Sequence, residues 1–252
     1  MARAGASAGE GVPGWRGARV VALAAIALGA LTPATAATSA AAATPTAASP
    51  AHMVYHGSRD KRVVALTFDD GWGLSQCRHI LRTLIAEDAK ATFFPNAVYV
   101  RNAPHFWRRV AESGFPIGNH TYDHPDLTGL SARAVASQIR RDETAVERVI
   151  GRPMIKVLRP PYGAWDATVA RVAGSLGYRT MLDWDVPSGD DQGASAAGIR
   201  RNALRGGRGS VVLMHCGPSA TPGVLADVIA GYRARGFHFV TVPELLAGRR
   251  SG

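Results

Sequence analysis

Cysteine is nearly absent from this chain: among 252 residues there are only two, Cys77 and Cys216. Zinc-finger spacing is therefore missing, and no cysteine follows the N-terminal apolar run closely enough to indicate a lipoprotein anchor. In an exported protein an even count permits one disulfide, and two separate, half-buried thiols are the alternative.

Acidic residues are also in short supply. The chain has 19 Asp and Glu against 29 Lys and Arg, which gives a net charge of +10. Such a surface favours anionic polymers, including nucleic acid and acidic cell-wall polymers, or it is simply an arginine-rich solubilising surface. No compact run of Lys and Arg is interleaved with aromatic residues, and no helix-turn-helix spacing is present. We therefore expect no nucleic-acid partner.

The N-terminal apolar run, Val20–Leu31, is too short to cross a bilayer, since it holds about a dozen residues where roughly 20 are needed. Arginines precede it, and a proline and a small-x-small cleavage site follow it: Arg3, Arg16, Arg19, Pro33 and Ala34-Thr35-Ala36. This order is typical of a secretory signal peptide, here residues 1–36, so we expect a secreted, extracellular or cell-wall protein. An uncleaved membrane anchor is the alternative, because alanine-rich sequence continues past the cleavage site.

Residues 37–51 are a low-complexity stretch of Ala, Thr, Ser and Pro with nothing to bury. They are predicted to form a flexible linker. From His52 the composition becomes mixed, and a hydrophobic fraction of 46% suffices for a substantial core. We predict one large domain over residues 52–249.

Strand and helix patterns alternate about seven times in this domain, without internal repetition. The predicted strands are 63–68, 91–94, a short one after Gly118, 157–159, 180–184, 210–214 and 237–242. The predicted helices are one containing 80–85, then 104–113, 131–150, 166–176, 194–204 and 224–235. This alternation predicts an α/β fold, a distorted (β/α) barrel of about seven parallel strands. In such barrels the functional site lies at the carboxyl ends of the strands.

Polar clusters do follow the predicted strands. They are Thr67-Phe68-Asp69-Asp70-Gly71, Asn119-His120-Thr121-Tyr122-Asp123-His124, Arg159-Pro160-Pro161-Tyr162-Gly163, and Leu213-Met214-His215 with Asp185, Asp190 and Asp191 on the preceding loop. Taken by itself, the pair His120 and His124 would be expected to be ordinary surface or core histidines. Taken by itself, the pair Asp69 and Asp70 would be expected to form a solvated turn. Their joint occurrence at strand ends favours one site.

Adjacent carboxylates on an extended segment point to opposite sides, so we expect Asp69 and Asp70 to have separate roles. One would bind a metal while the other accepts a proton. His120 and His124 are four residues apart, and on one helical turn both rings would face the same way. Two histidines and one aspartate suit a divalent transition metal with positions left open for water and substrate.

Four motifs in order, TFDDG, HTYDH, RPPYG and LMH, resemble the motif set of the polysaccharide deacetylases of carbohydrate esterase family 4. The resemblance covers roughly residues 55–248 and extends to the tail segments Thr221-Pro222 and 239–246. It implies a metal-dependent hydrolase of acetylated polysaccharides, with zinc as the expected metal, although other divalent metals serve in this family.

The resemblance also implies a role for each matching residue. Asp70, His120 and His124 would bind the metal. Asp69 would be the general base, oriented by Arg159. The backbone N–H of Tyr162 would donate a hydrogen bond to the oxyanion. His215 would be the general acid, and Leu213 would line the pocket for the acetyl group.

One motif departs from the family pattern, in which Asp-Trp follows the strand preceding the acid histidine. Here Asp190 aligns with the carboxylate that tunes this histidine, and Asp191 stands where the tryptophan is usual. Trp184 is the expected substrate-pocket residue. Trp165 and Trp72 are further candidates to supply the missing wall, and ordinary packing is the alternative for each tryptophan. Cys77 and Cys216 both fall on the catalytic face, which favours a disulfide between two active-site loops.

The expected function is hydrolysis of N-acetyl groups on a GlcNAc-containing polysaccharide, either peptidoglycan or a chitin-like polymer. Two alternatives stay open: an O-deacetylase acting on acetylxylan, and a non-catalytic carbohydrate-binding protein. The sequence retains every expected metal ligand and both proton-transfer residues, which disfavours the second. We expect a monomer whose partner is the polysaccharide substrate, with association with the cell wall left open.

Overall fold

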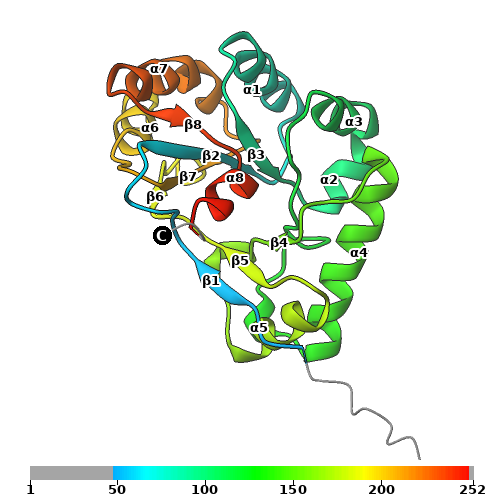
Figure 1. Cartoon of the computed structure of the whole chain (residues 1–252). Helices are drawn as coiled ribbons and strands as arrows, with labels where there is room; N and C mark the ends of the chain where they lie inside the picture. The colour runs from blue at the N-terminus through cyan, green and yellow to red at the C-terminus, as the bar shows by residue number, and fades with distance from the viewer. Residues whose placement is uncertain (1–47, 250–252) are drawn as a thin grey trace, which may run out of the picture. The chain divides into compact units, whose positions relative to one another are not determined.

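The computed structural model describes residues 48–249, coloured in Figure 1. The predicted signal peptide, 1–36, and most of the linker, 37–51, lie outside the described residues, so both stay predictions. Within residues 48–249, no helix has the length and apolar character needed to cross a membrane.

Two groups of strands, all parallel, form the framework. The larger sheet has the order β3-β2-β7-β6, with β8 also paired to β2: β2 (Val63–Asp69), β3 (Ala91–Phe94), β6 (Val186–Pro187), β7 (Ser210–His215) and β8 (His238–Phe239). The smaller sheet has the order β1-β5-β4: β1 (His52–Val54), β4 (Val157–Leu158) and β5 (Thr180–Leu182).

Isolated parallel bridges connect the two sheets. Phe93 of β3 pairs with Ile117, and Asn119 pairs with Leu158 of β4, so the strands continue from one sheet to the other. At the other side the only such link among residues 48–249 is an antiparallel bridge from His56 to Ser210. The result is the predicted α/β fold, a distorted barrel.

The bounds of the helices are α1 (Leu74–Ala86), α2 (Ala97–Asn102), α3 (Pro104–Glu112), α4 (Ala132–Ile150), α5 (Ala167–Ser175), α6 (Ala196–Ala203), α7 (Thr221–Ala234) and α8 (Val242–Ala247), with short 3-10 turns at Leu127–Gly129 and Pro161–Gly163. Helices α1 to α7 lie outside the strands, whereas the short α8 lies between the two sheets (Figure 1), where its Val242 and Leu245 pack with buried residues of β2, β5 and β7. Ser131 is the N-cap of α4, because its side chain accepts from the backbone N–H of Ala134. Gly151, in the left-handed conformation, ends this helix.

Several predicted elements have different limits. The short strand after Gly118 exists only as the two bridges at Ile117 and Asn119. The last strand ends at Phe239, because Thr241 and Glu244 form a capping box that begins α8 where the strand was predicted to continue. Strands β1 and β6 and helices α2 and α8 were not predicted.

Strand β2 lies at the centre of the larger sheet, and every residue after Val63 in it is buried. In its register with β7, Asp69 is opposite His215, so the first and last polar clusters meet at the carboxyl edge. Cys77 of α1 and Cys216, directly after β7, form the predicted disulfide, which connects helix α1, and not a loop, to the segment that follows β7.

Candidate active site

A cleft of about 870 Å³ opens at the carboxyl ends of the strands. Eight of the residues expected at the site line it: Asp69, Asp70, His120, His124, Tyr162, Trp184, Leu213 and His215. Arg159 and Asp190 lie behind the cleft surface as buried partners of lining residues.

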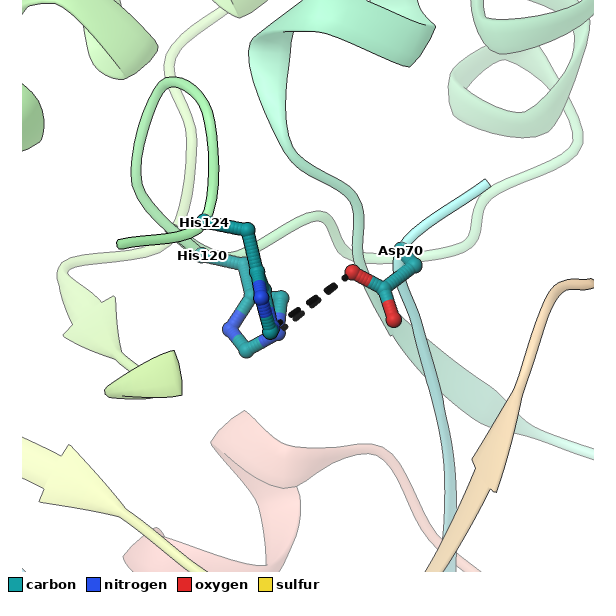
Figure 2. Close-up of side chains that lie close together, drawn as sticks. All are labelled: Asp70, His120 and His124. Carbon is teal, nitrogen blue, oxygen red and sulfur yellow. Dashed lines mark ion pairs between the residues drawn. The ribbon is translucent and has the colours of Figure 1, made fainter. Parts of the chain in front are cut away.

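Asp70, His120 and His124 converge in this cleft (Figure 2). The Oδ1 atom of Asp70 lies 3.8 Å from Nε2 of His120 and 3.7 Å from Nε2 of His124. Asn96, at the start of α2, donates its Nδ2–H to the same Oδ1 at 2.8 Å. The Nδ1 of His120 is 2.7 Å from the carbonyl oxygen of Arg159, which fixes Nδ1 as the protonated nitrogen and leaves the Nε2 lone pair toward Asp70.

These donors fit a divalent transition metal. Ligand atoms about 2.0–2.1 Å from one tetrahedral ion are about 3.3 Å apart, only slightly closer than the distances found here. Burial lowers the pKa of both His120 and His124, which favours the neutral ring that a metal requires. Burial raises the pKa of Asp70 to about 6, and the charge of His124 opposes this rise. The protein alone therefore supplies too little positive charge to offset the burial of this carboxylate.

The prediction that His120 and His124 share a helical turn is wrong. Both lie in a loop between Asn119 and the 3-10 turn, and Thr121 and His124 have φ angles of 69° and 63°. Left-handed backbone costs a non-glycine residue about 1–2 kcal/mol. Local hydrogen bonds stabilise it: the Thr121 N–H donates to Asn119 Oδ1 at 3.0 Å, and the His124 N–H donates to Thr121 Oγ1 at 3.2 Å.

The premise that Asp69 and Asp70 point to opposite sides is also wrong. Asp70 has a φ of 66°, so the extended strand ends at Asp69 and the chain turns. Both carboxylates consequently face the cleft, and Oδ2 of Asp69 lies 3.8 Å from Nε2 of His120. Their separate environments distinguish them, since Asp70 has the two histidines and Asp69 has an arginine.

Arg159 holds Asp69 in place. Its Nη1 donates to Asp69 Oδ1 at 2.6 Å and to Thr67 Oγ1 at 2.9 Å, and the guanidinium is completely buried. Further donations from Arg159 go to the carbonyl oxygens of Leu182 and Asp183. A buried ion pair with this many partners fixes one oxygen of Asp69 and leaves the other facing the cleft.

His215 is held by Asp190 on the opposite side of the cleft. The ring Nδ1 is 2.8 Å from Asp190 Oδ1, and the His215 backbone N–H donates to Oδ2 at 2.8 Å. Burial alone would lower the pKa of His215, but the Asp190 hydrogen bond and the charges of Asp69, Asp190 and Asp191 outweigh it and raise the pKa to about 9. His215 is therefore protonated at neutral pH.

Two tryptophans line the cleft and a third does not. Trp72 and Trp184 are lining residues, whereas Trp165 is not among them. Trp72 is 46% exposed, its ring centroid is 6.0 Å from that of His215, and its indole lies over Gly217, where a Cβ would come within 2.0 Å of it. Asp191 also lines the cleft, with its Oδ1 3.9 Å from His215 Nδ1.

Tyr162 forms part of the opposite wall. It is 69% exposed, adopts a left-handed φ of 60°, and its ring lies edge-on to His124 with centroids 4.6 Å apart. Leu213 is buried in the cleft floor between β2 and β6.

Sequence reasoning missed several polar residues around the site. Asn96 follows strand β3, so the strand-end rule could have identified it. Ser188 and Thr221 donate to Asp190 at 2.9 and 2.6 Å. Asp142 is fully buried on α4, where burial raises the pKa of its carboxyl well above the usual range and the facing backbone N–H groups of His120 and Ala97 offset part of that rise. A single aspartate on the apolar face of a predicted helix was the available signal.

A family model and the sequences of known deacetylases match this chain. Residues 56–181 match the family model described as polysaccharide deacetylase. Over 196 residues the chain is 34% identical to a peptidoglycan-N-acetylglucosamine deacetylase of Bacillus cereus, covering 76% of this chain and 70% of that protein. A peptidoglycan-N-acetylglucosamine deacetylase of Listeria monocytogenes is 33% identical over 189 residues, which are 75% of this chain but only 40% of the relative's length.

Solved structures of the same family superpose on this chain. A peptidoglycan N-acetylglucosamine deacetylase bound to a naphthalenyl benzamide compound superposes with a TM-score of 0.73 at 33% identity, over 77% of this chain and 92% of that one. A pseudoenzyme of carbohydrate esterase family 4 from Bacillus anthracis superposes with a TM-score of 0.74 at 27% identity, over 79% of this chain and 70% of that one. Similarity of fold alone therefore leaves the activity to be argued from the site.

Proposed function

The chain belongs to the polysaccharide deacetylases of carbohydrate esterase family 4, and on that basis we propose that it removes N-acetyl groups from GlcNAc residues of peptidoglycan. The enzyme class follows from the family and from the Asp70, His120 and His124 metal site. Peptidoglycan is favoured because the two relatives described above are named for that polymer. Export through residues 1–36 belongs to the same proposal, since a wall polymer lies outside the cell.

One observation carries the proposal. In a single cleft, three metal ligands lie beside a carboxylate fixed by a buried arginine and a histidine fixed by a buried aspartate. When bound there, a divalent metal supplies Lewis-acid polarisation of the acetyl carbonyl and lowers the pKa of water.

Asp69 has the position of the general base. Arg159 anchors its Oδ1, and Oδ2 faces the metal-binding histidines, where it can take a proton from the attacking water. Because the buried guanidinium holds Oδ1, Oδ2 is the oxygen left free for this step. The backbone N–H of Tyr162 is proposed to donate to the carbonyl oxygen as its negative charge develops.

His215 has the complementary role. An amine leaves the tetrahedral carbon only when it receives a proton, and His215 carries that proton at neutral pH because its pKa is raised to about 9. The overall reaction consumes one water and gives acetate and a free amine on the sugar. We assign zinc as the metal, because two imidazoles and one carboxylate with open positions suit it.

The test is product analysis on three polymers with the mature protein: purified peptidoglycan, chitin oligomers and acetylxylan. We expect acetate and new primary amines in equal amounts from peptidoglycan, and loss of both products after chelator treatment followed by recovery with Zn²⁺. Acetate from acetylxylan alone would replace the proposal with O-deacetylation. No acetate from any polymer, with metal bound, would make the protein a non-catalytic relative like the Bacillus anthracis pseudoenzyme.

A further inference from the structure

The loop that carries two of the three metal ligands contacts helix α4 through polar side chains. Gln138 is on the face of α4 toward the loop, and its Oε1 accepts from the backbone N–H groups of Tyr122 at 3.0 Å and Asp123 at 3.3 Å. Its Nε2 donates to Asp123 Oδ1 at 2.7 Å. Because two N–H donors face Oε1, the orientation of the amide is determined by its partners. Gln138 thus binds the loop between its two left-handed residues, Thr121 and His124.

Asp142 lies one turn further along the same face of α4. It is completely buried, and within residues 48–249 no hydrogen bond of ordinary geometry reaches either carboxyl oxygen. The groups that face it are the backbone N–H of His120, which is a metal ligand, and that of Ala97, which begins α2. Both N–H groups belong to segments that position metal ligands, the loop of His120 and the start of α2 after Asn96.

Helix α2 connects this contact to the third ligand. Asn96, the residue before α2, donates to Asp70 Oδ1 at 2.8 Å. The Val98 N–H of the first turn of α2 donates to the Tyr122 carbonyl oxygen in the ligand loop at 3.1 Å. Gln138 therefore contacts the loop that carries His120 and His124, and Asp142 is buried one turn along α4, the helix that packs against α2.

We infer that Gln138 and Asp142 are positioning residues that hold Asp70, His120 and His124 in the metal-binding arrangement and so determine the affinity for the divalent metal. Without Gln138 the left-handed loop loses the acceptor of its Tyr122 and Asp123 N–H groups and relaxes, which separates the two histidines. Residues behind a metal ligand typically change metal affinity by about 10- to 100-fold when replaced. The inference rests on the metal site of the proposed deacetylase and makes no assumption about its polymer.

Four variants of the mature protein test it. Gln138→Met and Asp142→Leu replace each polar group by an apolar one of similar size. Gln138→Glu and Asp142→Asn restore an acceptor oxygen. Val146→Ala is the matched control, because Val146 is the next buried residue along the same face of α4 and contacts the hydrophobic core.

The measurements are the Kd for Zn²⁺, by competition with a chromophoric chelator, and the visible spectrum of the Co²⁺-loaded protein. We expect the two apolar variants to raise the Kd by roughly 10- to 100-fold and to shift the Co²⁺ bands, with partial recovery in the acceptor-restoring variants. Val146→Ala should lower the melting temperature of the metal-free protein without changing the Kd.

A Kd within twofold of the wild type in folded Gln138→Met and Asp142→Leu would overturn the inference. An equal loss of affinity in Val146→Ala would also overturn it, because general destabilisation would then explain the effect. If the apolar variants do not fold, Gln138→Ala decides, because alanine suits a helix and removes the same acceptor; a Kd within twofold of the wild type is then the contradicting result. Since no substrate is present, inactivity on peptidoglycan would refute the proposed function without affecting this test.

Discussion

Replacing Asp190 by asparagine should move the pH dependence of the reaction in a direction that the structure fixes. The hydrogen bond from His215 to Asp190 is the largest favourable contribution to the raised pKa of His215, which is about 9 instead of 6.5. Asp190→Asn removes this charged acceptor but leaves the charges of Asp69 and Asp191 in place. The pKa of His215 should therefore fall part of the way back toward 6.5.

The assay is the pH profile of kcat/KM for acetate release, whose alkaline limb reports the loss of the proton from the general acid. For a raised pKa, the protonated form is present below about 9 and is lost as the pH rises through that value. We expect the alkaline limb of Asp190→Asn to lie about one to two pH units lower than in the wild type.

Asp191→Asn is the matched control, because Asp191 is 3.9 Å from the same ring nitrogen and its side chain is 38% exposed. A more solvated charge at a longer distance should move the alkaline limb by much less. An unmoved alkaline limb in Asp190→Asn, or an equal movement in Asp191→Asn, would refute the assignment of His215 as an acid tuned by Asp190.

Three further predictions follow from single contacts. Asp69→Asn should reduce turnover at least about 100-fold, because Asp69 takes the proton from the attacking water. Zn²⁺ binding, measured by calorimetry, should stay within a few-fold of the wild type, because Asp69 is not a metal ligand. Equal loss of Zn²⁺ binding would contradict this. Trp72→Ala should raise KM for the polymer roughly 3- to 10-fold, as expected for loss of an exposed stacking surface, without changing hydrolysis of a small acetyl ester; loss of both activities would contradict it. Replacing both Cys77 and Cys216 by alanine should lower the melting temperature by roughly 5–15 °C, because their disulfide closes a loop spanning 139 residues; an unchanged calorimetric transition would contradict it.

The sequence predicted the fold class and the edge of the strands that carries the site for the same reason. Buried parallel strands are apolar runs that end in polar residues, so Asp69, Asp70, Arg159 and His215 could be assigned to one edge before any coordinates were known. The resemblance to a known family then supplied the roles that strand patterns cannot give.

Backbone conformation at the site could not be predicted in this way. The left-handed φ of Asp70 depends on a partner distant in the sequence, the carbonyl oxygen of Phe94, which accepts from the Asp70 N–H at 3.0 Å. The left-handed φ of Thr121 depends on one particular side chain, that of Asn119, and not on a repeating pattern. Strand alternation and helical spacing assume regular backbone, so both failed where the chain turns into the cleft. At 239–242 the capping box of Thr241 and Glu244 likewise outweighed a β-branched pattern.

Asp142 illustrates a signal that was present but went unused. Val135, Ile139 and Val146 form the buried face of α4, and Asp142 falls on that face. A charged residue at a buried position requires a partner, but the sequence alone does not indicate which segment provides it. Only the structure shows that the facing groups belong to His120 and Ala97.

The most direct test of the central claim is a titration of the metal-free protein with Zn²⁺, in which acetate release from peptidoglycan and metal binding are measured on the same samples. If Asp70, His120 and His124 form the metal site of the deacetylase, activity should rise in proportion to bound Zn²⁺ and stop increasing at one ion per chain, and His120→Ala should show neither high-affinity binding nor activity. Acetate release from the metal-free protein, or full activity in His120→Ala, would contradict the claim.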